Sequence, residues 1–380
     1  MFPSTSNAAI ASRNWLLRLV RRRAGGRWLS WRIANAAREA LAAPVIADAT
    51  DAGFLYRQLL RLPLDGTGAI VHARAHPLLS ELAGRYEVRC VQYARDQALA
   101  LQALGVASEQ RLQGVFGWCA LLAVKSRQRT LADIADAWIH LVEGGCLIVV
   151  AANRGGAKSL HKRLQALGDV RHVSGAKCRL MMLRRQGEPD MLATWRAQGA
   201  RRLVNGLWTE PGLFSWDRLD RGSALLVRHL PRVLRGEGMD LCCGYGVLAR
   251  AIVRRPHSRC STVHLVDADA RALACARLNV RDMPCQTMLH WLDAACEALP
   301  AVDWIVCNPP FHQGLARRTE LGQRILAQGL ASLRPGGEIW LVANRRLPYE
   351  RVLRSACQEY ACVAQEDGFK VLYGRRARTP

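Results

Sequence analysis

The chain lacks several features that mark whole classes of proteins. Its longest apolar runs, such as VFGWCALLAV, are too short to cross a bilayer. The short apolar stretch near the N-terminus is not followed by a small-residue cleavage site, so a signal peptide is not expected. The 13 cysteines form no paired C-x-x-C motifs and no Cys/His cluster with zinc spacing. We therefore expect free thiols in a reducing, cytoplasmic compartment, no membrane association and no metal site.

Acidic residues are scarce: 31 Asp and Glu stand against 54 Lys and Arg, for a net charge of +23. Such a charge favours a polyanionic partner, nucleic acid first and a membrane surface second. A lineage that simply prefers arginine is the plain alternative. Residues 1–43 form a basic N-terminal arm, for which RNA binding, a poorly ordered tail and a misplaced start site all remain open.

What the chain does have is an alternation of strand and helix patterns over 380 residues, half of them hydrophobic. In the second half, buried strand patterns lie at GMDLCC, STVHLVDAD, VDWIVC and EIWLVAN, and VLARAIVRR, ARALACARLNV and ELGQRILAQGLASL read as helices. Strands and helices that alternate in this way predict an α/β fold with a parallel sheet covered on both faces.

The first half repeats part of that pattern. LVEGGCLIVVAANRGGAKSLHKRL, from Leu141, parallels LRPGGEIWLVANRRLPYERVL, from Leu333, and SGAKCRLMMLRR, from Ser174, parallels EDGFKVLYGRR, from Glu366. Two matching blocks in the same order predict a duplicated domain. Where the second half has IVCNPPFH, the first has LLAVKSRQ, so the first copy is expected to be degenerate. We place a degenerate domain at 44–200, for substrate binding or support, and a catalytic domain at 201–380.

Two acidic positions and a glycine turn suggest a nucleoside site in the second half. Asp240 ends a strand, and Gly244 and Gly246 form the turn into a helix, where the backbone can approach a ligand closely. Asp267 ends the next strand, which places its carboxylate to accept hydrogen bonds from ribose hydroxyls. A second interpretation makes Asp267 the cap of the following helix, with Asp269 as its rival for that role.

The most specific motif is DWIVCNPPFH, with Asn308, Pro309, Pro310 and Phe311 as predicted catalytic residues. Two prolines after an apolar strand force a rigid, extended exit. The Asn308 amide oxygen and the Pro309 carbonyl can then accept hydrogen bonds from the two N–H groups of an exocyclic base amine. That grip favours a pyramidal nitrogen whose lone pair faces a methyl sulfonium. Phe311 offers a stacking face for a flipped-out base, and His312 is expected to be structural.

These blocks, together with GLFSWDRLDRGSALLV and the closing FKVLYGRR, resemble the methyltransferase small-domain proteins that make N2-methylguanine in bacterial ribosomal RNA, especially the small-subunit (16S) methyltransferase C group. The resemblance covers roughly residues 148–376. It implies two tandem Rossmann-like class I methyltransferase domains, each with a seven-stranded, mostly parallel sheet, and S-adenosyl-L-methionine as cofactor. It assigns to the cofactor site the acids and small residues Asp240, Gly244, Gly246, Asp267, Asp293, Asp220, Gly222 and Ser223. Cys242 departs from the family, which usually has glycine there.

The leading hypothesis is therefore an enzyme that methylates a guanine N2 amine in ribosomal RNA, free or within a subunit, and that acts as a monomer. One alternative keeps the fold and changes the substrate to an adenine N6 amine or a protein amide. The other is a non-catalytic RNA-binding factor in ribosome assembly, which Cys242 and the divergent first half suggest.

Overall fold

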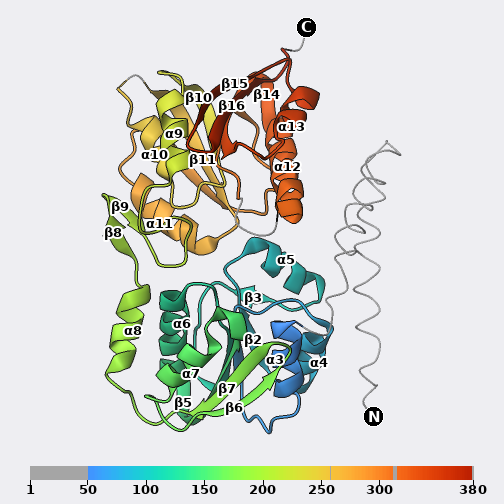
Figure 1. The fold of residues 1–380 in the computed structure, drawn as a ribbon, viewed down its shortest axis with the longest axis vertical. Helices are drawn as coiled ribbons and strands as arrows, with labels where there is room; N and C mark the ends of the chain where they lie inside the picture. The colour runs from blue at the N-terminus through green and yellow to red at the C-terminus, as the bar shows by residue number, and fades with distance from the viewer. Residues whose placement is uncertain (1–49, 257, 311–314, 379–380) are drawn as a thin grey trace, which may run out of the picture. The chain divides into compact units, whose positions relative to one another are not determined.

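The computed structural model describes residues 50–256, 258–310 and 315–378 (Figure 1). The predicted basic arm at 1–43 lies outside the described residues, as do Phe311 and His312. Asp51–Pro380 forms one compact unit. Within the described ranges, no helix is both long and apolar enough to span a membrane.

Two seven-stranded sheets with the same strand order dominate the described fold. From edge to edge the first sheet contains β3 (Ser108–Glu109), β2 (Val88–Val91), β1 (Gly68–Val71), β4 (Phe116–Leu122), β5 (Leu141–Ala152), β7 (Cys178–Arg184) and β6 (Arg171–Gly175). The second contains β12 (Gln286–Trp291), β11 (Arg259–Asp267), β10 (Arg235–Leu241), β13 (Val302–Cys307), β14 (Leu333–Asn344), β16 (Phe369–Arg375) and β15 (Glu359–Glu366). In each sheet the pairing is parallel except around β7 or β16, which run antiparallel to both neighbours. The predicted fold class is confirmed.

Helices cover both faces of each sheet, because alternate residues of the central strands face opposite clusters of buried side chains. The first sheet is flanked by α3 (Asp51–Leu59), α4 (Pro77–Arg85) and α5 (Arg95–Ala103) on one face and by α6 (Arg127–Ile139), α7 (Ala157–Leu164) and α8 (Met191–Gly199) on the other. The second is flanked by α9 (Arg221–His229), α10 (Val247–Val253) and α11 (Ala270–Val280), and by α12 (Leu315–Ser332) and α13 (Glu350–Ala356).

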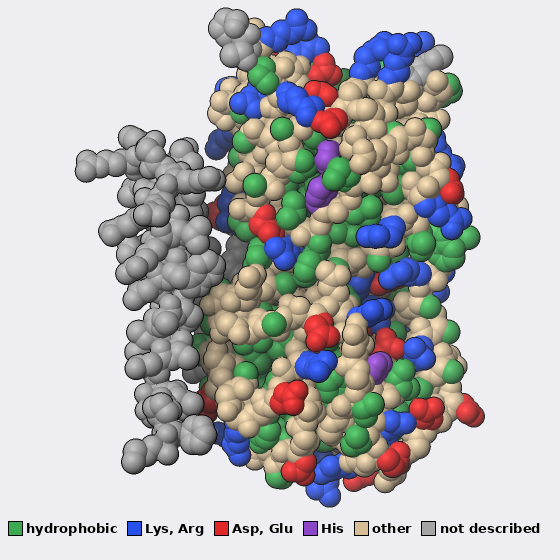
Figure 2. All heavy atoms as spheres, turned by 180° about the vertical axis from the view of Figure 1, so that it is seen from behind, with side chains coloured by type: hydrophobic (Ala, Val, Ile, Leu, Met, Phe, Trp, Pro, Cys, Tyr) green, Lys and Arg blue, Asp and Glu red, His purple; other side chains and the backbone are tan. Residues whose placement is uncertain are grey.

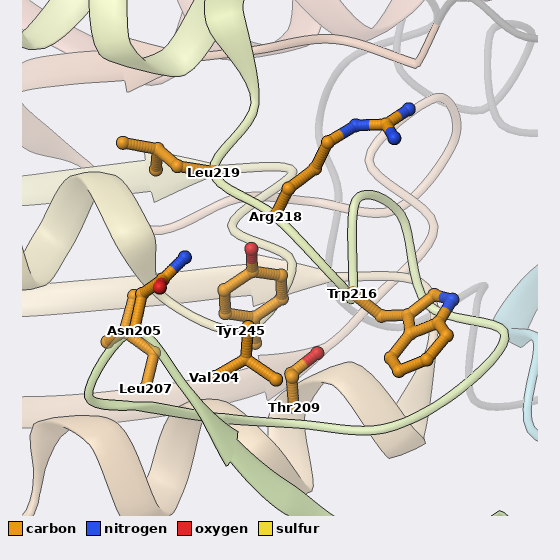
Figure 3. A pocket seen from close by; sticks show the side chains of 8 residues that line it. All are labelled: Val204, Asn205, Leu207, Thr209, Trp216, Arg218, Leu219 and Tyr245. Carbon is orange, nitrogen blue, oxygen red and sulfur yellow. The ribbon is translucent and has the colours of Figure 1, made fainter.

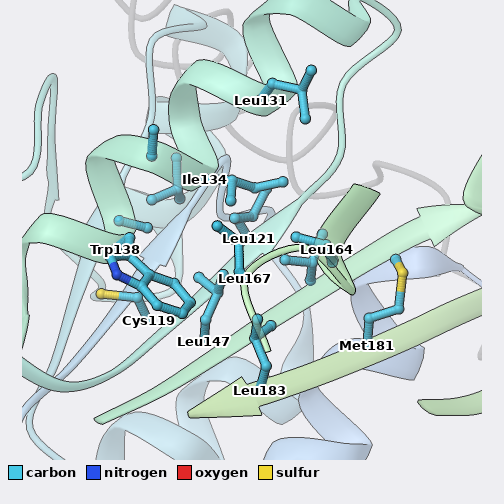
Figure 4. Packing of buried hydrophobic residues seen from close by; sticks show 14 of the residues in the cluster. Cys119, Leu121, Leu131, Ile134, Trp138, Leu147, Leu164, Leu167, Met181 and Leu183 are labelled. Carbon is cyan, nitrogen blue, oxygen red and sulfur yellow. The ribbon is translucent and has the colours of Figure 1, made fainter. Parts of the chain in front are cut away.

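Helix α6 shows how the sequence builds these layers. Ser126 caps its first turn by accepting from the Arg129 N–H. Leu131, Ile134 and Trp138 then follow at helical spacing, and Figure 4 shows them packed over the strands of the first sheet. Each fully buried side chain of this kind stabilises the fold by about 1.5–3 kcal/mol.

The internal repeat is visible in matching details. Gly68 pairs with Trp118 in the first sheet, and Gly238 pairs with Trp304 in the second. A Cβ atom at Gly68 would lie 2.0 Å from the Trp118 ring, and one at Gly238 would lie 1.9 Å from the Trp304 ring. In each half, a glycine on one central strand thus leaves room for the ring of a buried tryptophan on the next strand.

The same register shows which residue of the first copy corresponds to Asn308. Val71 lies opposite Leu121 as Leu241 lies opposite Cys307, so Leu122 occupies the position of Asn308. The apolar side chain of Leu122 cannot grip an amine. A letter-by-letter alignment of IVCNPPFH with LLAVKSRQ would pair Asn308 with Val124, so the sheet register shifts that alignment by two residues.

Candidate active site at the ends of β10, β11 and β13

The predicted glycine turn follows β10 and leads into α10. Its backbone enters the left-handed region three times, at Cys242 (φ 61°), Gly244 (φ 54°) and Gly246 (φ 84°). Glycine adopts this conformation without steric cost. Gly246 is also closely packed, because a Cβ there would lie 3.3 Å from Leu265. Gly244 faces open space, so a ligand can approach its backbone.

Cys242 accepts the same conformation with a side chain, at a cost of about 1–2 kcal/mol. Its side chain packs against a core cluster that contains Cys307 and Tyr349. A hydrogen bond with the Cys307 thiol, followed by burial, raises the pKa of Cys242 well above its ordinary value. Cys242 is thus a neutral packing residue at the turn. His72, which is also left-handed (φ 58°), holds the equivalent position after β1.

Asp240 is fully buried at the base of this turn. Its Oδ2 accepts from the Ala249 N–H of α10 at 2.8 Å. Its Oδ1 is buried and accepts from no residue that the structure describes. Burial raises the pKa of Asp240 to about 7, because the carboxylate is removed from water. An orphaned carboxylate oxygen beside this turn fits a cationic or hydroxyl-bearing ligand.

Asp267 links the turn to the end of β11. Its Oδ2 accepts from the Gly244 N–H at 2.7 Å, and its Oδ1 accepts from the Asp269 N–H at 2.8 Å. Burial raises the pKa of Asp267 to about 6, against the effect of these backbone donors. Asp269 is the residue that caps α11, through the Arg271 N–H at 2.9 Å. The capping interpretation of Asp267 is therefore wrong, and its predicted ribose role stays a prediction.

Asp293 lies just after the end of β12, the strand that pairs with β11. Its Oδ1 accepts from the Ala295 N–H at 3.0 Å, which makes a tight turn. Its own N–H donates to Oε2 of Glu297 at 2.8 Å. The structure thus brings Asp293 to the same sheet edge as Asp240 and Asp267, in agreement with the register of β10, β11 and β12.

Asn308 follows β13, the other neighbour of β10. Its Nδ2 donates to Oδ2 of Asp220 at 3.0 Å and to the Ser223 hydroxyl at 2.9 Å. Its Oδ1 is buried and accepts from none of the described residues. Two acceptors therefore fix the orientation of the amide, which leaves its carbonyl oxygen available. Pro309 is buried and Pro310 is exposed.

The segment from Asp220 to Ser223 begins α9. Asp220 caps this helix by accepting from the Ser223 N–H at 2.7 Å. A Cβ at Gly222 would lie 3.0 Å from Oδ2 of Asp220 and 3.2 Å from the Phe369 ring, so the glycine keeps this start compact. The resemblance placed these residues at the cofactor. The structure places Asp220 and Ser223 on Asn308, a link that the sequence reasoning missed.

A shallow pocket borders the glycine turn (Figure 3). Tyr245, from the turn itself, donates its hydroxyl to the Ser215 carbonyl at 3.0 Å. Thr209 comes from the hairpin of β8 (Arg202–Val204) and β9 (Leu207–Thr209). Trp216 and Arg218 line the pocket from the loop between β9 and α9. Trp216 and Arg218 belong to the block GLFSWDRLDRGSALLV, but no role at the site was predicted for any of these residues. In the described ranges, no group of three His, Cys, Asp or Glu residues is placed to hold a metal ion.

Class I methyltransferases are built on this sheet, and the Asn308 loop beside the glycine turn places the second half among them. Residues 205–373 match the family described as Methyltransferase small domain. The ribosomal RNA small subunit methyltransferase C of Pseudomonas paraeruginosa (strain DSM 24068 / PA7) is 35% identical over 274 residues, which cover 69% of this chain and 80% of the relative. The protein of that name from Ectopseudomonas mendocina (strain ymp) is 34% identical over 298 residues, which cover 75% and 88%.

The chain belongs to the ribosomal RNA small subunit methyltransferase C family. A solved structure, the T. thermophilus 16S rRNA N2 G1207 methyltransferase in complex with AdoMet and guanosine, has the same two-domain fold. It superposes with a TM-score of 0.72 at 22% identity and covers 88% of this chain and 93% of its own. The predicted family and the predicted enzyme class are confirmed.

Proposed function

We propose that this enzyme transfers a methyl group from S-adenosyl-L-methionine to the exocyclic N2 amine of a guanine in 16S ribosomal RNA. One observation carries the proposal: the Asn308 amide is fixed by Asp220 and Ser223, and its oxygen is a buried acceptor without a partner among the described residues. The names of the relatives, together with the AdoMet and guanosine in the solved structure, support the donor and the base.

The chain's own residues act by holding the acceptor nitrogen. The lone pair of a base amine is delocalised into the ring and is a poor nucleophile. Oδ1 of Asn308 and the Pro309 carbonyl accept hydrogen bonds from the two N–H groups of the amine, which favours a pyramidal nitrogen. The proton then leaves easily, because the methylated amine is strongly acidic. S-adenosyl-L-methionine supplies the electrophilic methyl group when it is bound, and Phe311 is proposed to stack on the base.

The residues at the turn fit that cofactor. Asp240 offers an orphaned buried oxygen, and Gly244 presents open backbone. Asp267 and Asp293 stand at the tips of the next two strands, where carboxylate oxygens can accept from the ribose and the adenine amine. Asp220, Gly222, Ser223 and Gly246 are proposed to shape the site rather than to carry its chemistry.

The first half, 44–200, is proposed to bind substrate and support the catalytic half, 201–380. The net charge of +23 supports an RNA partner. Figure 2 shows Lys and Arg side chains spread over one face of the molecule among acidic and apolar ones. We propose that the protein acts as a cytoplasmic monomer on ribosomal RNA or a ribosomal subunit. Family membership favours this function over adenine-N6 or protein methylation and over a non-catalytic assembly factor.

The test is transfer of labelled methyl from S-adenosyl-L-methionine to 16S rRNA that lacks the modification, followed by nucleoside mass spectrometry. We expect N2-methylguanosine, and Asn308→Ala should reduce the rate by about 10²–10³-fold. Asn153→Ala, at an exposed asparagine of the first copy, is the matched control and should retain full activity. Absence of transfer, label on adenine or protein, or an Asn308→Ala variant with wild-type activity would overturn the proposal.

A further inference from the structure

One short segment of the first copy lies against two loops of the second. The Tyr93–Arg95 backbone pairs with the loop after β11: Arg95 N–H donates to the Ala268 carbonyl at 2.8 Å, and Ala270 N–H donates to the Tyr93 carbonyl at 2.9 Å. The Trp291 indole N–H, at the end of β12, donates to the carbonyls of both Tyr93 (3.0 Å) and Ala268 (2.9 Å). This segment therefore holds the ends of β11 and β12 together.

The Arg95 side chain extends the contact to the loop after β12. Its guanidinium binds the Glu297 carboxylate through two hydrogen bonds of 2.9 and 2.7 Å, and it lies 5.0 Å from the Trp291 ring centre. Oε2 of Glu297 accepts from the Asp293 N–H as well. The hydrogen bond from Arg95 lowers the pKa of Glu297, so the pair stays charged. A chain of three groups thus leads from the first copy to the backbone of Asp293.

We propose that Arg95 is a positioning residue for the cofactor: through Glu297 it orders the Asp293 loop, so the copy without catalytic residues sets the cofactor affinity of the other. The inference rests on the proposed cofactor roles of Asp267 and Asp293. A loop that is ordered before binding does not pay its conformational entropy at the moment of binding. The loss of Arg95 should therefore weaken cofactor binding and leave the methyl-transfer step unchanged.

A separate set of buried and partly buried charges also joins the halves. Arg271 of α11 binds Asp269 at 2.7 Å, and its guanidinium lies 5.1 Å from the Tyr93 ring centre. Burial lowers the pKa of Arg271, but the charges of Asp269, Asp133 and Glu210 outweigh burial and raise it. This set does not include Arg95. Removing the Arg95 side chain therefore leaves other contacts between the halves in place, so an effect on affinity can be measured in a folded protein.

The experiment titrates the full-length protein with S-adenosyl-L-methionine by calorimetry and measures methyl-transfer kinetics. For Arg95→Ala and Glu297→Gln we expect the cofactor Kd and KM to rise about five- to twentyfold, as for the loss of a charge-assisted bidentate contact, with kcat within about twofold of wild type. Arg95→Lys, which keeps one bond, should be intermediate. The double variant should bind the cofactor no more weakly than either single variant, because both substitutions remove the same link.

Arg74→Ala is the matched control, because Arg74 binds the Asp51 carboxylate through bonds of 2.8 and 3.0 Å within the first copy alone. It should leave the cofactor Kd unchanged. A wild-type Kd in Arg95→Ala would overturn the inference, and so would a fall in kcat at an unchanged KM. Calorimetric binding is measured without RNA, so the outcome for the cofactor Kd is independent of the RNA substrate. A wild-type protein that does not bind S-adenosyl-L-methionine would instead refute the proposed function.

Discussion

The Nδ2 atom of Asn308 lies 3.0 Å from Oδ2 of Asp220, and this hydrogen bond joins two residues that are 88 positions apart in the chain. Without it the amide could present either its NH2 group or its oxygen to a substrate. A carboxylate can only accept, so Asp220 selects the orientation in which the oxygen faces away. Asp220 is therefore the residue that makes Asn308 an acceptor.

Replacing Asp220 should separate stability from activity. Asp220→Ala removes both the α9 cap and the Asn308 anchor, so it should cost about 1 kcal/mol of unfolding free energy and about 10–100-fold in methyl-transfer rate. Asp220→Ser restores a capping hydroxyl that is too short to orient Asn308. We expect chemical denaturation to show recovered stability in Asp220→Ser while the rate stays low. Recovery of both together would show that Asp220 acts only as a cap.

Cofactor binding should depend on pH because of the two buried acids. The pKa is raised by burial to about 7 for Asp240 and to about 6 for Asp267, so both carboxyls are mostly protonated at about pH 5.5 and ionised at about pH 8. The cationic cofactor and its ribose hydroxyls favour the ionised forms. Binding should therefore release protons and weaken by about tenfold at about pH 5.5. Calorimetry in two buffers of different ionisation enthalpy measures this, and Asp240→Asn should reduce the proton release.

The same raised pKa values predict that, in the absence of cofactor, the contribution of these two acids to the free energy of unfolding falls as the pH rises, whereas cofactor binding becomes stronger. Both folded-state pKa values lie above the unfolded value of about 3.9, so their contribution to stability is present below about pH 4 and is lost as pH rises through about 6 and 7. Asp240→Asn should therefore gain stability over wild type as the pH rises from about 5 to about 8. A difference in unfolding free energy that does not change with pH would contradict the assignment.

The paired glycines test the repeated architecture. Gly68→Ala and Gly238→Ala should each destabilise the protein by about 2–3 kcal/mol, because the new methyl group would overlap the Trp118 or Trp304 ring. Gly84→Ala in α4 meets no atom within 4 Å and should be neutral or stabilising by up to about 1 kcal/mol. Thermal and denaturant unfolding measure all three. A tolerated Gly238→Ala would show that the second copy can repack around Trp304.

The sequence predicted those parts of the molecule that depend on local patterns. The matching blocks from Leu141 and Leu333 became β5 and β14, and the loop of Asn308 follows a strand next to the glycine turn, as expected. It did not predict contacts between distant segments. Nothing in the spacing of Asp220 or Arg95 identifies Asn308 or Glu297 as its partner, because tertiary packing decides those pairs. The choice between Asp267 and Asp269 as helix cap likewise needed backbone geometry.

The most direct test of the Asn308–Asp220 relationship is the single-turnover rate of methyl transfer, at saturating cofactor, for two variants. Asn308→Asp alone places a second carboxylate about 3 Å from Asp220, so repulsion should turn it away or make the pair share a proton, and the rate should fall at least about 100-fold. Adding Asp220→Asn lets the amide NH2 at position 220 donate to the carboxylate at position 308, which presents its other oxygen to the base; the same atom no longer accepts from the Ser223 N–H, so α9 loses this cap. We predict that this double variant is at least about tenfold faster than Asn308→Asp at about pH 7.5. If the double variant is no faster than Asn308→Asp, an oriented acceptor at position 308 is not what drives methyl transfer.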